Sequence, residues 1–308
     1  MITATKIRAA LAAALAVGVT AALVGCSSGN PLSSGSSASA APAGTIVIGS
    51  QQYYSNTIIA ELYAQVLAHD GFTVKRDYNI GQREVYLPQM EKGNIDVLPE
   101  YSGNLLQYFD KSSTASSPAQ IAAGLKTALP KTITALPAAP ATDQDSYTVT
   151  KAFSDKWGVT SLAQLSKVTV PLTVGANSEF KTRPYGPDGL KKDYGVTVGF
   201  TAIEDSGGAL TVKALNDGSV QLADIYTADP SIKANNFVTL KDPKNLILPQ
   251  NVTPIVSKKV NSKAQADIEK VDKYLTTSAL ITLNSESTVG KQQTSAIAKK
   301  FLQQHGLI

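Results

Sequence analysis

Residues 93–103 read GNIDVLPEYSG, and the apolar residues Ile95, Val97 and Leu98 inside this stretch predict a buried strand over residues 95–98 that is bounded by turn residues. Four further elements precede it in alternating order, namely strand 46–48, helix 58–67, strand 72–74 and helix 85–92. Ser55 or Asn56 is placed to cap the first helix. This β-α-β-α-β order predicts a parallel sheet covered by helices.

The middle of the chain repeats this alternation. Strands are expected at residues 147–150, 169–174, 196–200 and 222–226, with helices near Leu162 and over residues 210–216. The end of the chain is helical, at residues 264–275 and 292–305. Taken together, the elements predict an α/β protein with two lobes.

The N-terminal segment has the features of an export signal. Lys6 and Arg8 are followed by an uncharged, alanine-rich stretch that ends at Cys26, the only cysteine. The stretch is too short to be a good membrane-spanning helix, and a cysteine directly after Leu-Val-Gly resembles the lipidation site of bacterial lipoproteins. We therefore expect residues 1–25 to be a signal peptide and Cys26 to carry lipid. A lone thiol beside an ordinary signal peptide is the alternative.

The segment after the cysteine predicts a tether. Residues 26–44 are almost entirely Ser, Ala, Gly and Pro, a composition that cannot bury a core and behaves as a flexible linker. Folding is therefore expected to begin at residue 45.

Charge and residue usage exclude several classes of function. The net charge of +4 falls to +2 when the signal peptide with Lys6 and Arg8 is removed, so a nucleic-acid partner is not expected. The two histidines, His69 and His305, each precede a glycine at a predicted helix end, where they suit the helix dipole better than a metal. The chain has no phosphate-binding glycine pattern, and we expect neither a cofactor nor a metal.

Three tyrosines point to a ligand site. Tyr101 and Tyr226 come at the ends of predicted strands, and Tyr147 opens one. Ligands bind at the carboxyl ends of strands in open α/β sheets, and aromatic faces attract quaternary ammonium groups. Asp96 and Glu100 could instead form a carboxylate pair for glycoside hydrolysis, although their spacing is a weak signal.

The motif at residues 93–103 resembles the substrate-binding proteins of glycine betaine, choline and carnitine ABC importers. The resemblance continues through four further stretches, namely EFKTRP at 179–184, DGL at 188–190, ADIYTAD at 223–229 and FLQQHGL at 301–307. It covers nearly all of the chain after the tether.

The resemblance implies a type II periplasmic-binding-protein fold with two lobes and two crossing hinge strands. The expected boundaries are residues 45–142 and 248–308 for lobe 1 and residues 143–247 for lobe 2.

The resemblance also implies the site residues. In that family, tyrosines box a trimethylammonium group and an arginine grips the ligand carboxylate. Tyr101, Tyr147 and Tyr226 match box positions, and Arg183 matches the arginine. A planar guanidinium suits bidentate recognition of a carboxylate.

Four positions depart from the family pattern. Gln51 stands where a lysine usually serves the anion site, Gln82 lies in an altered glycine turn, and Asn104 replaces a threonine. Asn251 falls on the fourth wall of the aromatic box, so we expect one wall to be missing. These changes leave the ligand open within the class.

The predicted function is that of an extracytoplasmic, lipid-anchored solute-binding protein on the outer face of the cell membrane. It would capture a quaternary-amine osmoprotectant as a monomer and deliver it to the transmembrane subunits of an ABC permease, without catalysis. Two alternatives remain: a binding protein for another polar or aromatic solute, and a lyase or hydrolase that uses Glu100 or Asp224.

Overall fold

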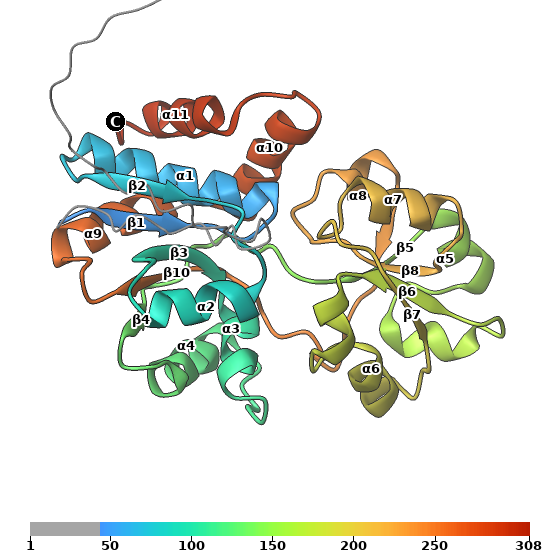
Figure 1. The fold of residues 1–308 in the computed structure, drawn as a ribbon. Helices are drawn as coiled ribbons and strands as arrows, with labels where there is room; N and C mark the ends of the chain where they lie inside the picture. The colour runs from blue at the N-terminus through green and yellow to red at the C-terminus, as the bar shows by residue number, and fades with distance from the viewer. Residues whose placement is uncertain (1–43) are drawn as a thin grey trace, which may run out of the picture. The chain divides into compact units, whose positions relative to one another are not determined.

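The computed structural model describes residues 44–308 (Figure 1). The predicted signal peptide, the lipidation of Cys26 and nearly all of the tether lie outside the described residues. Within the described part, no helix is both long enough and apolar enough to cross a membrane.

The first sheet has five strands in the order β2-β1-β3-β10-β4. They are β1 (Ile46–Gly49), β2 (Val74–Asp77), β3 (Val97–Tyr101), β4 (Ile133–Ala135) and β10 (Val252–Ser257). Strand β1 pairs in parallel with β2 and β3, whereas β10 runs antiparallel to β3 and β4. We call the part of the chain built on this sheet lobe 1.

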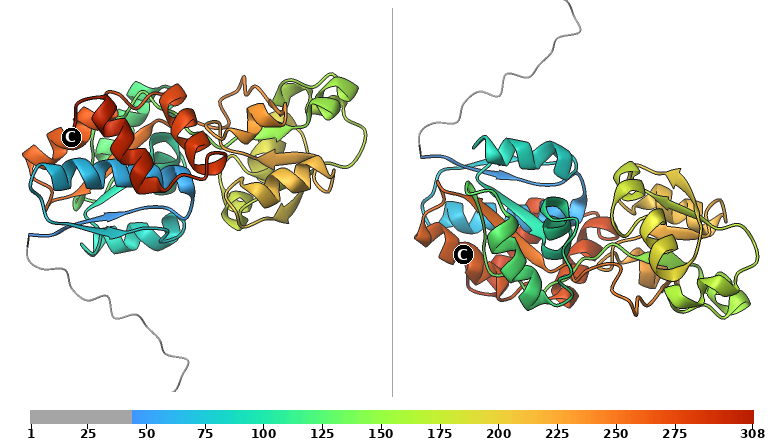
Figure 2. Two further views of the ribbon diagram at one scale, coloured as in Figure 1. Left: turned by 90° about the horizontal axis from the view of Figure 1, so that it is seen from above. Right: turned by 90° about the horizontal axis from the view of Figure 1, so that it is seen from below.

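Helices cover both faces of this sheet (Figures 1 and 2). One face carries α1 (Tyr54–His69), α9 (Ser262–Asp272), α10 (Thr277–Thr288) and α11 (Thr294–Gln304), and the other carries α2 (Arg83–Glu91), α3 (Ser102–Phe109) and α4 (Pro118–Ala128). Val97 belongs to the first core and its neighbour Leu98 to the second. Successive side chains of a strand point to opposite faces, so β3 contributes to both cores.

The second sheet also has five strands, in the order β7-β6-β8-β5-β9. They are β5 (Tyr147–Val149), β6 (Thr173–Ala176), β7 (Gly199–Ala202), β8 (Leu222–Asp224) and β9 (Val238–Thr239). Its helical segments are α5 (Lys151–Trp157), η1 (Leu162–Lys167), η2 (Ser178–Thr182), α6 (Pro187–Tyr194), α7 (Ala209–Asn216) and α8 (Ser231–Ala234). We call this part lobe 2.

Two extended segments join the lobes. They pair through an antiparallel bridge between Thr142 and Asn251, and the Val252 N–H donates to the Ala141 carbonyl at 2.9 Å. The start of α3 lies against the second segment, because a Cβ at Gly103 would come 2.6 Å from the Pro249 oxygen. The two crossing strands that the family resemblance implied are therefore present.

The structure differs from the sequence prediction at strand bounds and by several elements that the sequence did not predict. Strand β3 runs to Tyr101, three residues beyond the predicted end. The elements that were not predicted include α3, α4, α5, α6, α8 and α10 and the strands β4, β9 and β10. The proline at position 254 argues against a central strand, yet it lies opposite Pro99 in a fully buried β10.

Candidate functional site

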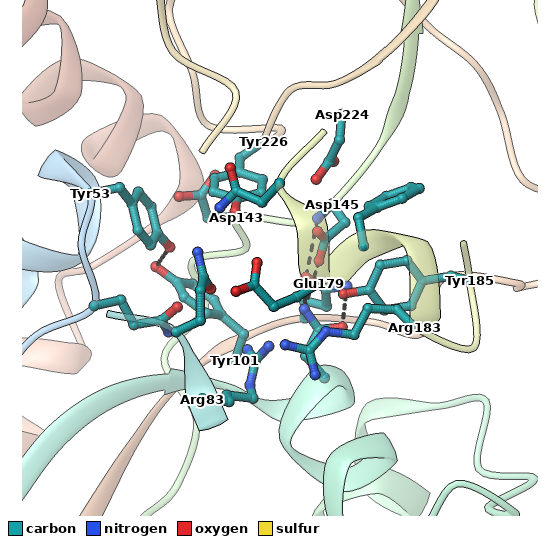
Figure 3. Close-up of a pocket in the computed structure, with 16 residues that line it drawn as sticks. Tyr53, Arg83, Tyr101, Asp143, Asp145, Glu179, Arg183, Tyr185, Asp224 and Tyr226 are labelled. Carbon is teal, nitrogen blue, oxygen red and sulfur yellow. Dashed lines mark hydrogen bonds between the residues drawn. The ribbon is translucent and has the colours of Figure 1, made fainter. Parts of the chain in front are cut away.

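A small cavity is lined by residues that follow or end strands of both sheets (Figure 3). Lobe 1 contributes Gln51 and Tyr53 after β1 and Tyr101 at the end of β3, and lobe 2 contributes Asn177 and Glu179 after β6 and Asp224 and Tyr226 at the end of β8. The cavity volume is about 30 Å³, which is room for one or two water molecules.

Three tyrosine rings gather at one side of the cavity. Tyr53 packs edge-on against Tyr226 with ring centroids 5.1 Å apart, and it lies 6.3 Å from the ring of Tyr101. The hydroxyl of Tyr53 donates to that of Tyr101. Burial raises the pKa of all three phenols above the usual value, so they stay neutral and present intact aromatic rings.

Asp143 lies beside this cluster, in the first segment that joins the lobes. Its carboxyl group accepts from Ser55 Oγ of lobe 1 and from the Ala228 N–H of lobe 2, both at 2.9 Å. Burial raises the pKa of Asp143 to about 7. Ser55 and Asn56 were predicted as helix caps, but the first binds Asp143 and the second accepts from the Gln51 N–H at 2.9 Å.

Two more aspartates form a polar wall. Asn104 Nδ2 donates to Asp145 Oδ2 at 2.6 Å, and the Asp145 N–H donates to Gln250 Oε1 at 3.1 Å. Asp224 accepts from the Ser146 N–H at 2.9 Å. Burial, followed by the negative charge of Asp145 and a hydrogen bond with it, raises the pKa of Asp224. The two carboxyl groups are thus close neighbours that disfavour joint ionisation.

Arg83 is bound to a carboxylate inside lobe 1. Its Nε and Nη2 donate to the two oxygens of Glu100 at 2.7 and 2.9 Å. Glu100 also accepts from Tyr86 Oη at 2.5 Å and from the Tyr101 N–H at 2.6 Å. Its side chain is fully buried and does not line the cavity. The hydrogen bonds of Glu100 are therefore all made within the protein, and its carboxylate is not accessible to a solute.

Arg183, the predicted carboxylate anchor, is bound to Glu84 of α2. Its Nη1 lies 3.0 Å from Glu84 Oε1, and its Nη2 donates to Oε2 at 3.2 Å. This ion pair joins lobe 2 to lobe 1, and the Glu84 side chain is 48% exposed. Both arginines that line the cavity are thus already neutralised by glutamates.

Two polar atoms in the cavity lining lack partners. Gln51 is 3% exposed, and its Nε2 makes no hydrogen bond to any described residue. The same holds for the buried Oε2 of Glu179, whose carboxylate extends toward Tyr101 in Figure 3. A buried polar atom without a partner is costly, so these two atoms mark where a solute could bind.

The structure brings five of the seven predicted ligand residues to the cavity. They are Gln51, Tyr101, Asn104, Arg183 and Tyr226. The departures from the family pattern at Gln82 and Asn104 also fall in the lining.

The structure places Tyr147 and Asn251 elsewhere. Tyr147 is 1% exposed in the core of lobe 2, and its hydroxyl donates to the Tyr185 carbonyl at 2.8 Å. Asn251 Nδ2 donates to the Ala139 carbonyl at 3.1 Å, while its neighbour Gln250 lines the cavity. One step along an extended chain turns the side chain to the other face. The side chain of Asn251 therefore does not line the cavity, and the aromatic residues that do line it include Tyr53 and Tyr185.

Other candidates from the sequence have internal partners. Asp96, the suggested partner of Glu100, accepts from the Val47 N–H at 3.0 Å and from Ser257 Oγ at 2.7 Å, and it lies outside the cavity. His305 stacks on Tyr274 with centroids 4.4 Å apart. In the part of the chain that the structure describes, no group of three potential metal ligands is found.

Sequence reasoning missed Tyr53, Tyr185, Asp143, Asp145 and Glu179 as lining residues. The strand-end rule that selected Tyr101 could also have found Tyr53, which comes four residues after β1. The two aspartates lie in a segment between lobes, and only the three-dimensional fold brings them to the tyrosines.

Comparison with known proteins identifies the family. Residues 44–304 match the family described as the substrate-binding domain of ABC-type glycine betaine transport systems. The glycine betaine-binding protein YehZ of Escherichia coli is 25% identical over 280 residues, which is 86% of this chain and 92% of that protein. The carnitine transport binding protein OpuCC of Listeria monocytogenes is 23% identical, with 85% and 87% covered.

Solved structures agree on the fold. The crystal structure titled glycine betaine/carnitine/choline ABC transporter matches with a TM-score of 0.68 at 21% identity, over 85% of this chain and 99% of that one. The curated relatives are named as binding proteins and not as enzymes. The chain therefore belongs to the substrate-binding family of ABC-type glycine betaine transport systems and has the two-lobed type II periplasmic-binding-protein fold.

Proposed function

We propose that this protein captures a quaternary-amine osmoprotectant outside the cytoplasm and delivers it to an ABC permease. The observation that carries the proposal is the convergence of Tyr53, Tyr101 and Tyr226 on a cavity that is also lined by carboxylates. Relatives in the same family carry glycine betaine or carnitine in their names.

The ring cluster suits a trimethylammonium group in particular. Such a group has no N–H to donate, so its positive charge is held by ring faces and nearby anions instead of hydrogen bonds. A desolvated cation–π contact contributes roughly 0.5–2 kcal/mol. Phenols that stay neutral because burial raises their pKa supply this contact at all physiological pH values.

Binding must involve movement of the lining. The cavity of about 30 Å³ accommodates water but not a trimethylammonium group. We propose that the Arg183–Glu84 pair, which joins the lobes and is partly exposed, opens to admit the solute. The ligand then stabilises whichever arrangement it binds more tightly.

We propose that the solute leaves chemically unchanged. The glutamate considered for catalysis, Glu100, is enclosed by Arg83 and Tyr86, which leaves it unable to reach a substrate. Incubation with candidate solutes followed by mass spectrometry should recover them unaltered. A new product formed by purified protein would contradict this part of the proposal.

We further propose that the mature chain acts as a monomer, held to the outer face of the membrane by lipid on Cys26. The proposal rests on the charged start and apolar stretch before that cysteine. Cys26→Ala should release the protein from membrane fractions or block its processing. An unchanged mass and unchanged membrane association of the variant would contradict lipidation. Size-exclusion chromatography with light scattering tests whether the mature chain is a monomer.

A thermal-shift screen, followed by calorimetric titration, tests the proposed ligand class. Quaternary amines should raise the melting temperature, because a ligand that binds only the folded state stabilises it. Ethanolamine, the unmethylated counterpart of choline, should raise it much less. A screen in which only amino acids or aromatic solutes stabilise the protein would favour the alternative solute class.

A further inference from the structure

Within the proposed ligand class, the charges around the cavity distinguish ammonium alcohols from betaines. Four carboxyl side chains line it, those of Asp143, Asp145, Glu179 and Asp224. We propose that Glu179 is the counter-ion of the bound cation and that the cavity prefers a quaternary ammonium alcohol, such as choline, to a carboxylate-bearing betaine. This inference rests on the proposed function and names the solute more narrowly.

The lining arginines have little capacity left for a ligand carboxylate. The Arg83 guanidinium makes two hydrogen bonds to Glu100, and the pair is buried on both sides. A ligand that drew Arg83 away would leave the buried charge of Glu100 uncompensated, which is strongly unfavourable. Arg183 already has a carboxylate partner in Glu84, so an anionic ligand would have to compete with Glu84 for this guanidinium even after the pair opens.

None of the four lining carboxylates is in an ion pair with a described residue, and Glu179 is the one with a buried oxygen that lacks any hydrogen-bond partner. It comes from η2 of lobe 2, and its Oε2 is buried without a partner among the described residues. Figure 3 shows its carboxylate extended toward Tyr101, on the side where the tyrosine rings gather. An ammonium group held by those rings would therefore meet a negative charge that is otherwise unpaired.

Gln51 supplies the complementary contact. Its Nε2 is a buried donor without a partner among residues 44–308, and it lines the same cavity. An alcohol oxygen can accept from this amide and donate its own proton to a carboxylate. A ligand carboxylate can accept from Gln51 but has no proton to donate, and the carboxyl groups of Asp145 and Asp224 line the same cavity.

Calorimetric titration of the mature protein with choline and with glycine betaine tests the preference. We expect wild type to bind choline at least about 10-fold more tightly, which corresponds to about 1.4 kcal/mol. Equal or tighter binding of glycine betaine would overturn the inference while leaving the proposed function in place. Failure of both ligands to bind would overturn the proposed function and the inference together.

Glu179→Gln tests the counter-ion, with Glu91→Gln as the matched control. Glu91 is exposed at the end of α2 and does not line the cavity, so the control makes the same charge change without effect on either ligand. Glu179→Gln should weaken choline about 10-fold and glycine betaine much less, because only the betaine brings its own negative charge. Equal weakening of both ligands, or unchanged choline binding, would contradict the assigned role. If Glu179→Gln does not fold, two other measurements test the inference. The first is the preference of wild type for choline over glycine betaine, and the second is Gln51→Leu, which should weaken choline binding severalfold.

Discussion

Each of the two arginines that line the cavity is in an ion pair with a glutamate, but one pair lies within lobe 1 and the other joins the two lobes. Arg83 and Glu100 both belong to lobe 1, and their side chains are 5% and 0% exposed. Arg183 of lobe 2 binds Glu84 of lobe 1, and these side chains are 13% and 48% exposed. The first pair cannot open without leaving a buried charge, whereas the second can exchange its partner for water. Residues of the same type therefore build a rigid wall in one case and a separable contact between lobes in the other.

The largest expected effect comes from breaking the internal pair. Arg83→Met should lower the free energy of unfolding by about 3–5 kcal/mol, because Glu100 is left buried and charged. Urea unfolding measures this change, with Arg183→Met as the control. Adding Glu100→Gln should recover part of the loss. If both arginine variants are equally stable, the distinction between the two pairs is wrong.

Two buried aspartates extend the comparison to pH. Asp143 binds both lobes, whereas Asp272 accepts from Tyr63 Oη inside lobe 1 at 2.7 Å. Burial raises the pKa of Asp143 to about 7 and that of Asp272 to about 8. Because both values exceed the usual range near 4, folding favours the protonated forms. Their stabilising contribution is full below about pH 4 and is lost as pH rises through the folded-state pKa.

Asparagine variants separate the two contributions. Asp143→Asn and Asp272→Asn should each reduce the loss of stability between about pH 4 and pH 8, by an amount on the order of 2–4 kcal/mol. Thermal or urea unfolding across this pH range measures it. Saturating ligand should alter the pH dependence that Asp143 contributes and leave that of Asp272 unchanged. If ligand altered the pH dependence of both positions equally, the idea that Asp143 responds to the ligand because it lies in the segment that joins the lobes would be contradicted.

Removing the tyrosine rings should have smaller effects on ligand affinity. Tyr53→Leu and Tyr226→Leu should each weaken a quaternary amine by roughly 0.5–2 kcal/mol, while Tyr226→Phe should keep most of the affinity because the ring remains. Titration calorimetry measures each value. Tyr274→Leu is the control, since Tyr274 is exposed and lies outside the cavity. Equal losses for Tyr226→Leu and Tyr226→Phe would assign the contribution to the hydroxyl group.

The smallest effect is expected at the separable pair. Arg183→Ala should change the free energy of unfolding by at most about 1 kcal/mol, because Glu84 becomes solvated when its partner is removed. Choline affinity should be maintained. A selective loss of glycine betaine affinity would show instead that Arg183 grips a ligand carboxylate, as the family resemblance first implied.

Residue patterns were sufficient to predict the α/β class and the presence of β3 and β8, near whose ends Tyr101 and Tyr226 lie, but not the exact bounds of these strands. They were insufficient where the direction of a side chain decides its role. Tyr147 is part of β5 and pairs with Asp224 at the edge of the cavity, yet its ring turns into the core. Gln250 and Asn251 illustrate the same limit, since adjacent residues in an extended segment face opposite ways.

The ion-pair partners of the arginines could likewise not be predicted from the sequence. Glu84 and Arg183 are 99 positions apart, and no local pattern indicates that they meet. The motif at residues 179–184 placed Arg183 at the site but left its partner unknown. Long-range ion pairs depend on how two lobes fold onto shared connecting segments.

The most direct test of the central claim compares choline with 3,3-dimethyl-1-butanol, which has the same shape but no charge. If tyrosine rings and Glu179 hold a cation, calorimetric titration of the mature protein should show choline binding at least about 10-fold more tightly than the neutral alcohol. Equal affinities for the two would show that the cavity recognises shape and apolar surface alone, and would contradict the account.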